Sequence, residues 1–148
     1  MASHFRLDKV LKIREKEKDL SEIEFANAQQ RFESVARTLY ELLKKKEELE
    51  KQHEYNMRVG VQADTIRQYN LHLQSLQNSI MEQQMIVNHA RFEMEQKRNL
   101  IVHKSVEVKK YNLLKDKHIE NVLSKMKKEE NNQLDELSIL KLGERYGV

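Results

Sequence analysis

Apolar residues recur in alternating steps of three and four through the second half of the chain. The first steps fall on Ile66, Tyr69, Leu73, Leu76, Ile80, Gln83, Val87, Ala90 and Met94. The register continues, with more polar members, through Lys97, Ile101, Lys104, Val108, Tyr111, Lys115, His118, Val122 and Lys125. A three-four repeat kept over this length is typical of the a/d stripe of a coiled coil. The pattern therefore predicts a long helix over about residues 64–140.

The first part of the chain carries a looser version of the same stripe. Its apolar members are Ala28, Phe32, Val35, Leu39, Leu42 and Leu49, with Lys46 and His53 as polar breaks. Upstream, the apolar set shifts to Val10, Ile13, Leu20 and Ile23. We read this shift as a drift of the seam, as is expected where a straight helix meets a supercoil. A second helix is predicted over about residues 4–57.

A short break separates the two stripes. Gly60 is the only glycine before residue 143, and glycine can adopt the left-handed conformation that ends a helix. Asp64 is the predicted N-cap of the next helix, because its carboxylate can accept bonds from free backbone N–H groups. We therefore expect a turn over about residues 58–63.

Neither helix can bury its apolar stripe alone, so the short break predicts that the two fold back on each other. The expected fold class is all-α, a single antiparallel αα-hairpin coiled-coil domain over residues 1–148. Folding at the break pairs residues whose numbers add to about 120, which brings Val35 near Met85. The same arithmetic sets the apolar residues of the first turns, Phe5, Leu7, Val10 and Leu11, opposite Lys109, Lys110, Leu113 and Leu114.

Residues 116–148 have no partner within the predicted hairpin, although they still carry apolar side chains. These are Val122, Leu123, Met126, Leu134, Leu137, Leu140 and Leu142. Such a segment is either an ordered end that binds another molecule or a frayed tail.

Composition narrows the fold and the chemistry further. The chain has 148 residues with Gly 3, Pro 0 and Cys 0, too few turn formers for a sandwich, a barrel or a doubly wound sheet. The absence of cysteine excludes disulfides and Cys-ligated zinc. Its 27 basic and 24 acidic residues are interleaved, and clusters such as Lys44–Lys46 are followed at once by glutamates, which disfavours nucleic-acid binding. No signal peptide or membrane span is evident, so we expect a cytoplasmic protein.

Catalysis needs a pocket, and a two-helix coiled coil offers almost none. No two of the six histidines are three or four residues apart, so no helix face presents a paired metal site. We expect the histidines on the solvated surface, except His118, which falls on the seam. The sequence predicts a protein that is not an enzyme and binds no cofactor and no metal.

Three local features resemble the FliJ family of flagellar export proteins. The first is the opening Phe5-Arg6-Leu7-Asp8-Lys9-Val10-Leu11-Lys12-Ile13-Arg14-Glu15-Lys16-Glu17. The second is the Ala/Gln-rich patch Phe25-Ala26-Asn27-Ala28-Gln29-Gln30. The third is the break that precedes Tyr69, Leu73, Leu76 and Ile80. The resemblance covers essentially the whole chain.

The resemblance implies an export chaperone of the flagellar type III apparatus. FliJ proteins are two-helix coiled coils that insert into the ring of the export ATPase, promote its assembly and bind the membrane export gate. Other implied partners are the ATPase regulator and other export chaperones, and the implied location is the cytoplasmic face of the inner membrane, reached as a monomer through these partners. By position, the gate-binding face comprises Tyr69, His72, Leu73, Leu76, Ser79, Ile80 and Gln83. The ATPase-facing end comprises Phe5, Leu7, Val10, Leu11 and Arg14, with the segment beyond about residue 110.

Two other functions fit the same pattern. One is the stalk of a related secretion or rotary ATPase machine. The other is a structural tether that pairs with a second copy through the stripe over residues 66–122. The tether would form a dimer that dissociates on dilution, whereas a hairpin stays a monomer.

Overall fold

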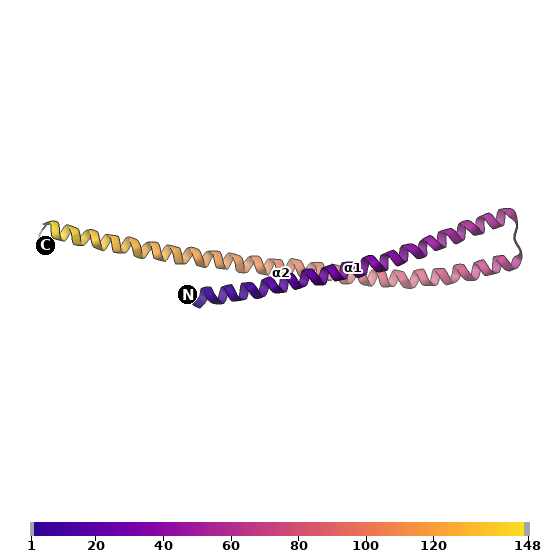
Figure 1. Ribbon diagram of the computed structural model, residues 1–148, viewed down its shortest axis with the longest axis horizontal. Coiled ribbons are helices and arrows are strands. Elements are labelled where there is room, and N and C mark those ends of the chain that lie inside the picture. The colour runs from indigo at the N-terminus through magenta and orange to yellow at the C-terminus, as the bar shows by residue number, and fades with distance from the viewer. Residues whose placement is uncertain (1, 147–148) are drawn as a thin grey trace. The chain divides into compact units, whose positions relative to one another are not determined.

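Two long helices and a three-residue turn make up the described chain. The computed structural model describes the backbone of residues 2–146 and the side chains of residues 6–145. Helix α1 spans Ala2–Val59 and helix α2 spans Ala63–Tyr146, joined by residues 60–62 (Figure 1). The predicted all-α hairpin is confirmed. Both helices run a few residues further than predicted, and α2 continues through Gly143 past the expected end near residue 140.

The turn between the helices forms as the glycine predicts, but the cap differs. Gly60 has φ 96°, and its N–H donates to the Asn56 carbonyl at 2.9 Å, which is the left-handed helix ending. The prediction that Asp64 is the N-cap is wrong, because α2 begins one residue earlier, at Ala63. The Gln62 carbonyl accepts from the N–H groups of Thr65 and Ile66 at 3.1 and 3.4 Å. Asp64 lies in the first turn, where its charge still favours the positive helix end.

The conformation of Gly60 gives a first prediction. A Cβ added at Gly60 would meet nothing within 4 Å, so the cost of Gly60→Ala comes only from the positive φ. We expect the substitution to lower the free energy of unfolding by about 1 kcal/mol. Gly60→Asn, which tolerates the left-handed region better, should cost less. Urea denaturation of both variants measures the difference, and equal stability of Gly60→Ala and the parent chain would contradict this view of the turn.

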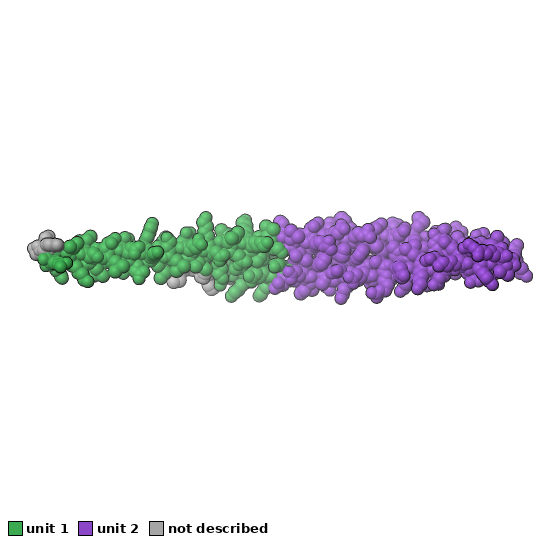
Figure 2. All heavy atoms as spheres, turned by 90° about the horizontal axis from the view of Figure 1, so that it is seen from above, with its two compact units in different colours: residues 1–18, 104–148 green, residues 19–103 purple. Residues whose placement is uncertain are grey.

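The chain divides into two compact units, which are coloured separately in Figure 2. Unit 2, residues 19–103, contains the turn and the adjoining parts of both helices. On α2 the most buried side chains of this unit are Leu76, Ile80, Val87 and Ala90, which lie on the predicted stripe. On α1 they are Ser21 and Ala28, which lie on the side that packs against α2. The small residues Ser21 and Ala28, 2% and 1% exposed, allow the two backbones to approach closely at this level.

The predicted drift of the seam on α1 is wrong. In unit 2, Leu20 and Ile23 are 57% and 58% exposed, while the polar Ser21 faces inward. In unit 1, Ile13 is 46% exposed, while its neighbour Leu11 is 5% exposed. The three-four register of α1 therefore continues unbroken toward its N-terminus. The positions of the apolar residues gave the wrong seam, because small or ion-paired polar side chains occupy inward positions in this part of α1.

Polar positions within the seam of unit 2 are matched across the two helices. Lys97, a d position, donates to Glu24 at 3.2 Å, and Arg31 lies 4.0 Å from Glu93. Two arginines of α2 also cover aromatic rings of α1. Arg91 lies 5.6 Å from the centre of the Phe32 ring, and Arg98 lies 5.5 Å from that of Phe25. These contacts replace part of the apolar packing that the weaker half of the stripe lacks.

Unit 1 joins residues 1–18 with residues 104–148. Among its described side chains, the buried apolar ones are Leu11 and Val108. Contact between the helices in this unit extends to Lys115, which bonds Asp8, and to the half-buried His118. The side chains of residues 119–142 are all exposed. Among the described residues, neither helix contains a stretch apolar enough to cross a membrane.

Candidate partner-binding surfaces

The residues of the expected gate-binding face lie on the first turns of α2, within unit 2. Leu76 and Ile80 are only 8% and 7% exposed, because they fill the seam against α1. The others divide into an exposed His72 and four half-buried side chains, Tyr69, Leu73, Ser79 and Gln83. The surface that a partner can reach here therefore consists of His72 and the outer edges of Tyr69, Leu73 and Ser79.

Gln83 is a polar member of the stripe that was also expected to contribute to the gate-binding face. In the structure its Nε2 donates to the Val35 carbonyl of α1 at 3.0 Å. Gln83 therefore belongs to the contact between the helices, and the bond confirms the predicted pairing of this part of α2 with the region around Val35.

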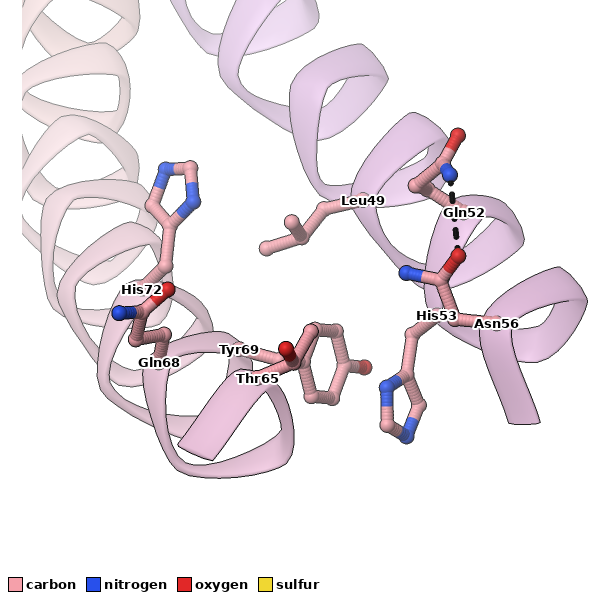
Figure 3. Close-up of a pocket in the computed structure, with 8 residues that line it drawn as sticks. All are labelled: Leu49, Gln52, His53, Asn56, Thr65, Gln68, Tyr69 and His72. Atoms are coloured by element: carbon pink, nitrogen blue, oxygen red, sulfur yellow. Dashed lines mark hydrogen bonds between the residues drawn. The ribbon is translucent and has the colours of Figure 1, made fainter. Parts of the chain in front are cut away.

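A small notch lies beside the turn, between the end of α1 and the start of α2 (Figure 3). It encloses about 200 Å³ and is lined by Leu49, Gln52, His53, Asn56, Thr65, Gln68, Tyr69 and His72. The His53 and Tyr69 rings stack within it, with centroids 3.7 Å apart and planes 2° from parallel. Gln52 donates to Asn56 at 3.2 Å on the α1 side. The prediction of a solvated His53 is thus wrong, since the ring is half-buried against Tyr69.

The notch extends the expected gate-binding face onto α1. Tyr69 and His72 were singled out from the sequence, whereas His53 and its α1 neighbours were not. The signal that could have found them is the pairing register, which sets His53 opposite Tyr69 across the turn. A partner that contacts His72 would also meet the amide groups of Gln52 and Asn56.

A network of charged side chains holds the helices together in unit 1. Arg14 lies 3.1 Å from Glu17, with its Nε 3.8 Å from the Glu107 carboxylate, and its guanidinium covers the Tyr111 ring at 5.7 Å. Glu17 also accepts a bond from Lys104 at 3.3 Å. The Arg14 Nε and the Glu107 oxygen are both shielded from solvent. Arg14, expected at the ATPase-facing end, is thus engaged within the chain.

These contacts shift the ionisation of their members. The hydrogen bonds from Arg14 and then Lys104 hold the pKa of the Glu17 carboxyl below its ordinary value. At the next contact, the bond to Asp8 at 2.7 Å raises the pKa of Lys115 above that of a free lysine. Both shifts favour the charged forms, so the charged pairs are the stable state of this segment near neutral pH.

The pKa shifts predict how stability depends on pH. A carboxyl with a lowered pKa contributes stability above the ordinary value of about 4.3, and this is lost as the pH falls through the folded value. A lysine with a raised pKa contributes below about 10.4, and this is lost as the pH rises through its folded value. We expect Glu17→Gln to flatten the acid side of a plot of melting temperature against pH and to leave the alkaline side unchanged. An acid limb as steep as that of the parent chain would contradict the role of Glu17.

The other residues of the expected ATPase-facing end are partly covered by the hairpin itself. Leu7 and Val10 are half-buried and Leu11 is buried, while the side chain of Phe5 lies outside the described residues. The four α2 residues that were predicted to pack against these first turns of α1 face solvent instead. Leu113 and Leu114 are 69% and 42% exposed, and Lys109 and Lys110 are exposed as well. The reason is the heptad register, which turns Val108, Tyr111 and Lys115 toward α1 instead.

Beyond His118, α2 keeps the large apolar side chains of residues 119–145 on the surface. Within unit 1, Leu123 and Met126 are each 60% exposed, and Leu137 and Leu140 are 55% and 65% exposed. We call residues 119–146 the overhang. An ordered helix that exposes this many large apolar side chains is typical of a surface that binds another protein.

Comparison with known proteins identifies the family. A model of the family described as "Flagellar FliJ protein" matches residues 3–145. This chain belongs to the FliJ family. It is also 34% identical, over 139 residues, to the "Flagellar FliJ protein" of Bacillus subtilis, an alignment that covers 94% of this chain and 95% of that one. No solved structure matches the chain.

Membership of the FliJ family agrees with the geometry of the chain. The family match begins in the first turn of α1 and ends in the last turn of α2, so it takes in both units and the overhang. FliJ proteins are flagellar proteins, and a role connected with flagellar export follows for this chain.

Proposed function

We propose that this chain is an export chaperone of the flagellar type III apparatus. It acts as a coiled-coil stalk that binds the export ATPase ring, promotes its assembly and links it to the membrane export gate. The observation that carries the proposal is the overhang, an ordered helix with an exposed apolar face, in a chain that the FliJ family model matches over residues 3–145. Its side chains do not pack against α1, so a partner can cover them.

The ATPase ring is the proposed partner of unit 1. The overhang supplies the exposed apolar surface, and the half-buried Leu7 and Val10 supply the adjoining surface of α1. Leu11 supports this surface from within the seam, and Arg14 fixes the two helices through its ion pairs. A single helix can enter a narrow opening that a folded domain cannot, since its diameter with side chains is about 10–12 Å.

The export gate is the proposed partner of unit 2. Its contact would use His72 and the outer edges of Tyr69, Leu73 and Ser79, which the structure leaves exposed or half-buried. Leu76, Ile80 and Gln83 hold this part of α2 against α1 and so support the surface from behind. Through the gate the protein would lie at the cytoplasmic face of the inner membrane, as a monomer. The ATPase regulator and the other export chaperones are further proposed partners.

Assembly of the export ATPase tests the proposed function. The purified chain is added to the export ATPase of the same bacterium, and the fraction of hexamer is measured by mass photometry together with the rate of ATP hydrolysis. We expect both to rise with the concentration of the chain. A hexamer fraction that does not change over a wide range of concentration would contradict the proposal.

A charge at Ser79 tests the gate contact. Ser79 is half-buried at the edge of the seam, so the Glu side chain of Ser79→Glu can extend into solvent without opening the hairpin. We expect the dissociation constant for the cytoplasmic part of the gate to rise by about tenfold, or ~1.4 kcal/mol. The melting temperature should stay close to that of the parent chain, and Ser79→Ala serves as the control. Unchanged affinity and motility for Ser79→Glu would count against this face.

A further inference from the structure

A second apolar surface lies on α2 in unit 1, on the side turned away from the seam. It is a groove of about 410 Å³, and all of its lining residues come from α2: Val106, Lys109, Lys110, Leu113, Leu114 and Lys117. Val106 and Leu113 are 59% and 69% exposed, and Leu114 is 42% exposed. We call these six residues the lysine-rimmed groove. None of them belongs to the heptad stripe that packs on α1.

The charged residues that line the groove are all basic. Lys109, Lys110 and Lys117 line it, and no acidic residue does. No ion pair within the described part of the chain engages any of these three lysines, whereas Lys104 and Lys115 of the same helix bond Glu17 and Asp8. The groove therefore combines an apolar floor with three exposed ammonium groups that an acidic partner can reach.

The spacing of the groove residues matches one face of a helix. Val106, Lys110, Leu113 and Lys117 follow one another in steps of four, three and four, which places them along one line of α2. A second helix laid along this line would place its own three-four stripe on Val106 and Leu113. Acidic residues beside that stripe would then reach the lysines, since pairing of opposite charges at the flanks sets the choice of partner in helix pairs.

We propose that the lysine-rimmed groove binds an amphipathic helix of another protein, one whose apolar stripe is flanked by aspartate or glutamate. This proposal rests on the proposed function in one respect: the export role implies that the partner helix belongs to a protein of the export apparatus. The apolar contact with Val106, Leu113 and Leu114 provides most of the binding free energy. The lysines raise the association rate and select an acidic partner over a basic one.

An anionic membrane surface would satisfy the same charges, but the groove fits it less well. Helices that lie in a membrane interface bury a large apolar face of Trp, Phe and Leu, whereas the groove offers only Val106, Leu113 and Leu114. Three lysines contribute about 1 kcal/mol each at an anionic surface, which is too little for stable attachment. A protein helix is therefore the occupant that the observations favour.

Two synthetic helical peptides test the proposal on the full chain. They share one leucine stripe at three-four spacing, but the flanking positions carry glutamate in one peptide and lysine in the other. Binding is followed by fluorescence anisotropy at low salt. We expect the acidic peptide to bind at least about tenfold more tightly than the basic one, and the difference to shrink as salt rises.

Substitutions locate the binding site. Leu113→Ser and Lys110→Glu should each weaken binding of the acidic peptide by about fivefold or more, and both side chains are exposed, so the hairpin should stay folded. The matched controls, Leu71→Ser and Lys45→Glu, change exposed residues of unit 2 and should leave binding unchanged. Circular dichroism checks the folding of all four variants.

Three outcomes would overturn the proposal: equal affinity for the two peptides, equal loss in the groove and control variants, or no binding of either peptide. A flotation assay with vesicles that contain phosphatidylserine measures binding of the chain to an anionic membrane. Binding to these vesicles that Lys110→Glu abolishes, without selective binding of the acidic peptide, would assign the groove to a membrane. None of these assays contains the export ATPase, so a failure of the proposed function is detected separately.

Discussion

A chain that ends at His118 is expected to keep its hairpin and to lose its effect on the export ATPase. The side chains of residues 119–142 are exposed, whereas Lys115, which the shortened chain keeps, bonds Asp8 of α1. Removing the overhang should therefore change the urea midpoint of the hairpin little. The same truncation removes the apolar surface proposed to enter the ATPase ring, so the rise in hexamer fraction should disappear.

A variant of full length separates the role of the apolar side chains from that of length. The triple substitution Leu134→Ser, Leu137→Ser and Leu140→Ser keeps the overhang but removes three of its large exposed apolar side chains. It should lose most of the stimulation, while the control Asn131→Ser should keep it. Full stimulation by the truncated chain would show that the ATPase contact lies elsewhere, in the paired part of unit 1 or in unit 2.

Leu76→Asp is expected to cause a large loss of stability. The Leu76 side chain is 8% exposed at the centre of the seam in unit 2, where a carboxylate has no cationic partner in the described contacts. The substitution loses the apolar burial of leucine and places a charge between the helices. We expect the free energy of unfolding to fall by about 3 kcal/mol or more, measured by urea denaturation.

Leu71→Asp is the matched control, because Leu71 is one turn and a half away on the same helix but 63% exposed. A charge there should change the free energy of unfolding by less than about 0.5 kcal/mol. If both variants lost stability equally, the distinction between the inner and outer faces of α2 would be wrong. Leu76→Asp also removes support from the proposed gate-binding face, so Ser79→Glu remains the better test of that contact.

Much of the fold could be predicted from the sequence, because one long stripe on α2 and one glycine at the turn leave few alternatives. The α2 stripe is apolar enough that its register determines which side faces α1. On α1 the apolar residues mark the wrong side between Val10 and Ile23. There the inward positions are taken by Arg14 and Ser21, and only the partners that they meet across the seam reveal this.

The candidate surfaces were predicted less completely. Residue numbers place Leu113 opposite the first turns of α1, but the direction of its side chain follows from the heptad register, which turns it outward. His53 was expected on the surface because it is polar, yet its ring can stack on Tyr69. Residue numbers predict which residues of the two helices lie at the same level of the hairpin. Which of these residues are in contact depends on the direction of each side chain.

One distance measurement tests the central claim, that a single chain folds back on itself near Gly60. Spin labels are placed at the exposed positions Ser34 and Gln84, which flank the bond between Val35 and Gln83. In a hairpin, helix axes about 8–10 Å apart keep the labels within roughly 25 Å of each other. In one continuous helix the same positions would lie about 75 Å apart. A short distance within each molecule, unchanged on dilution with unlabelled protein, is the predicted result, and a long one would contradict the account.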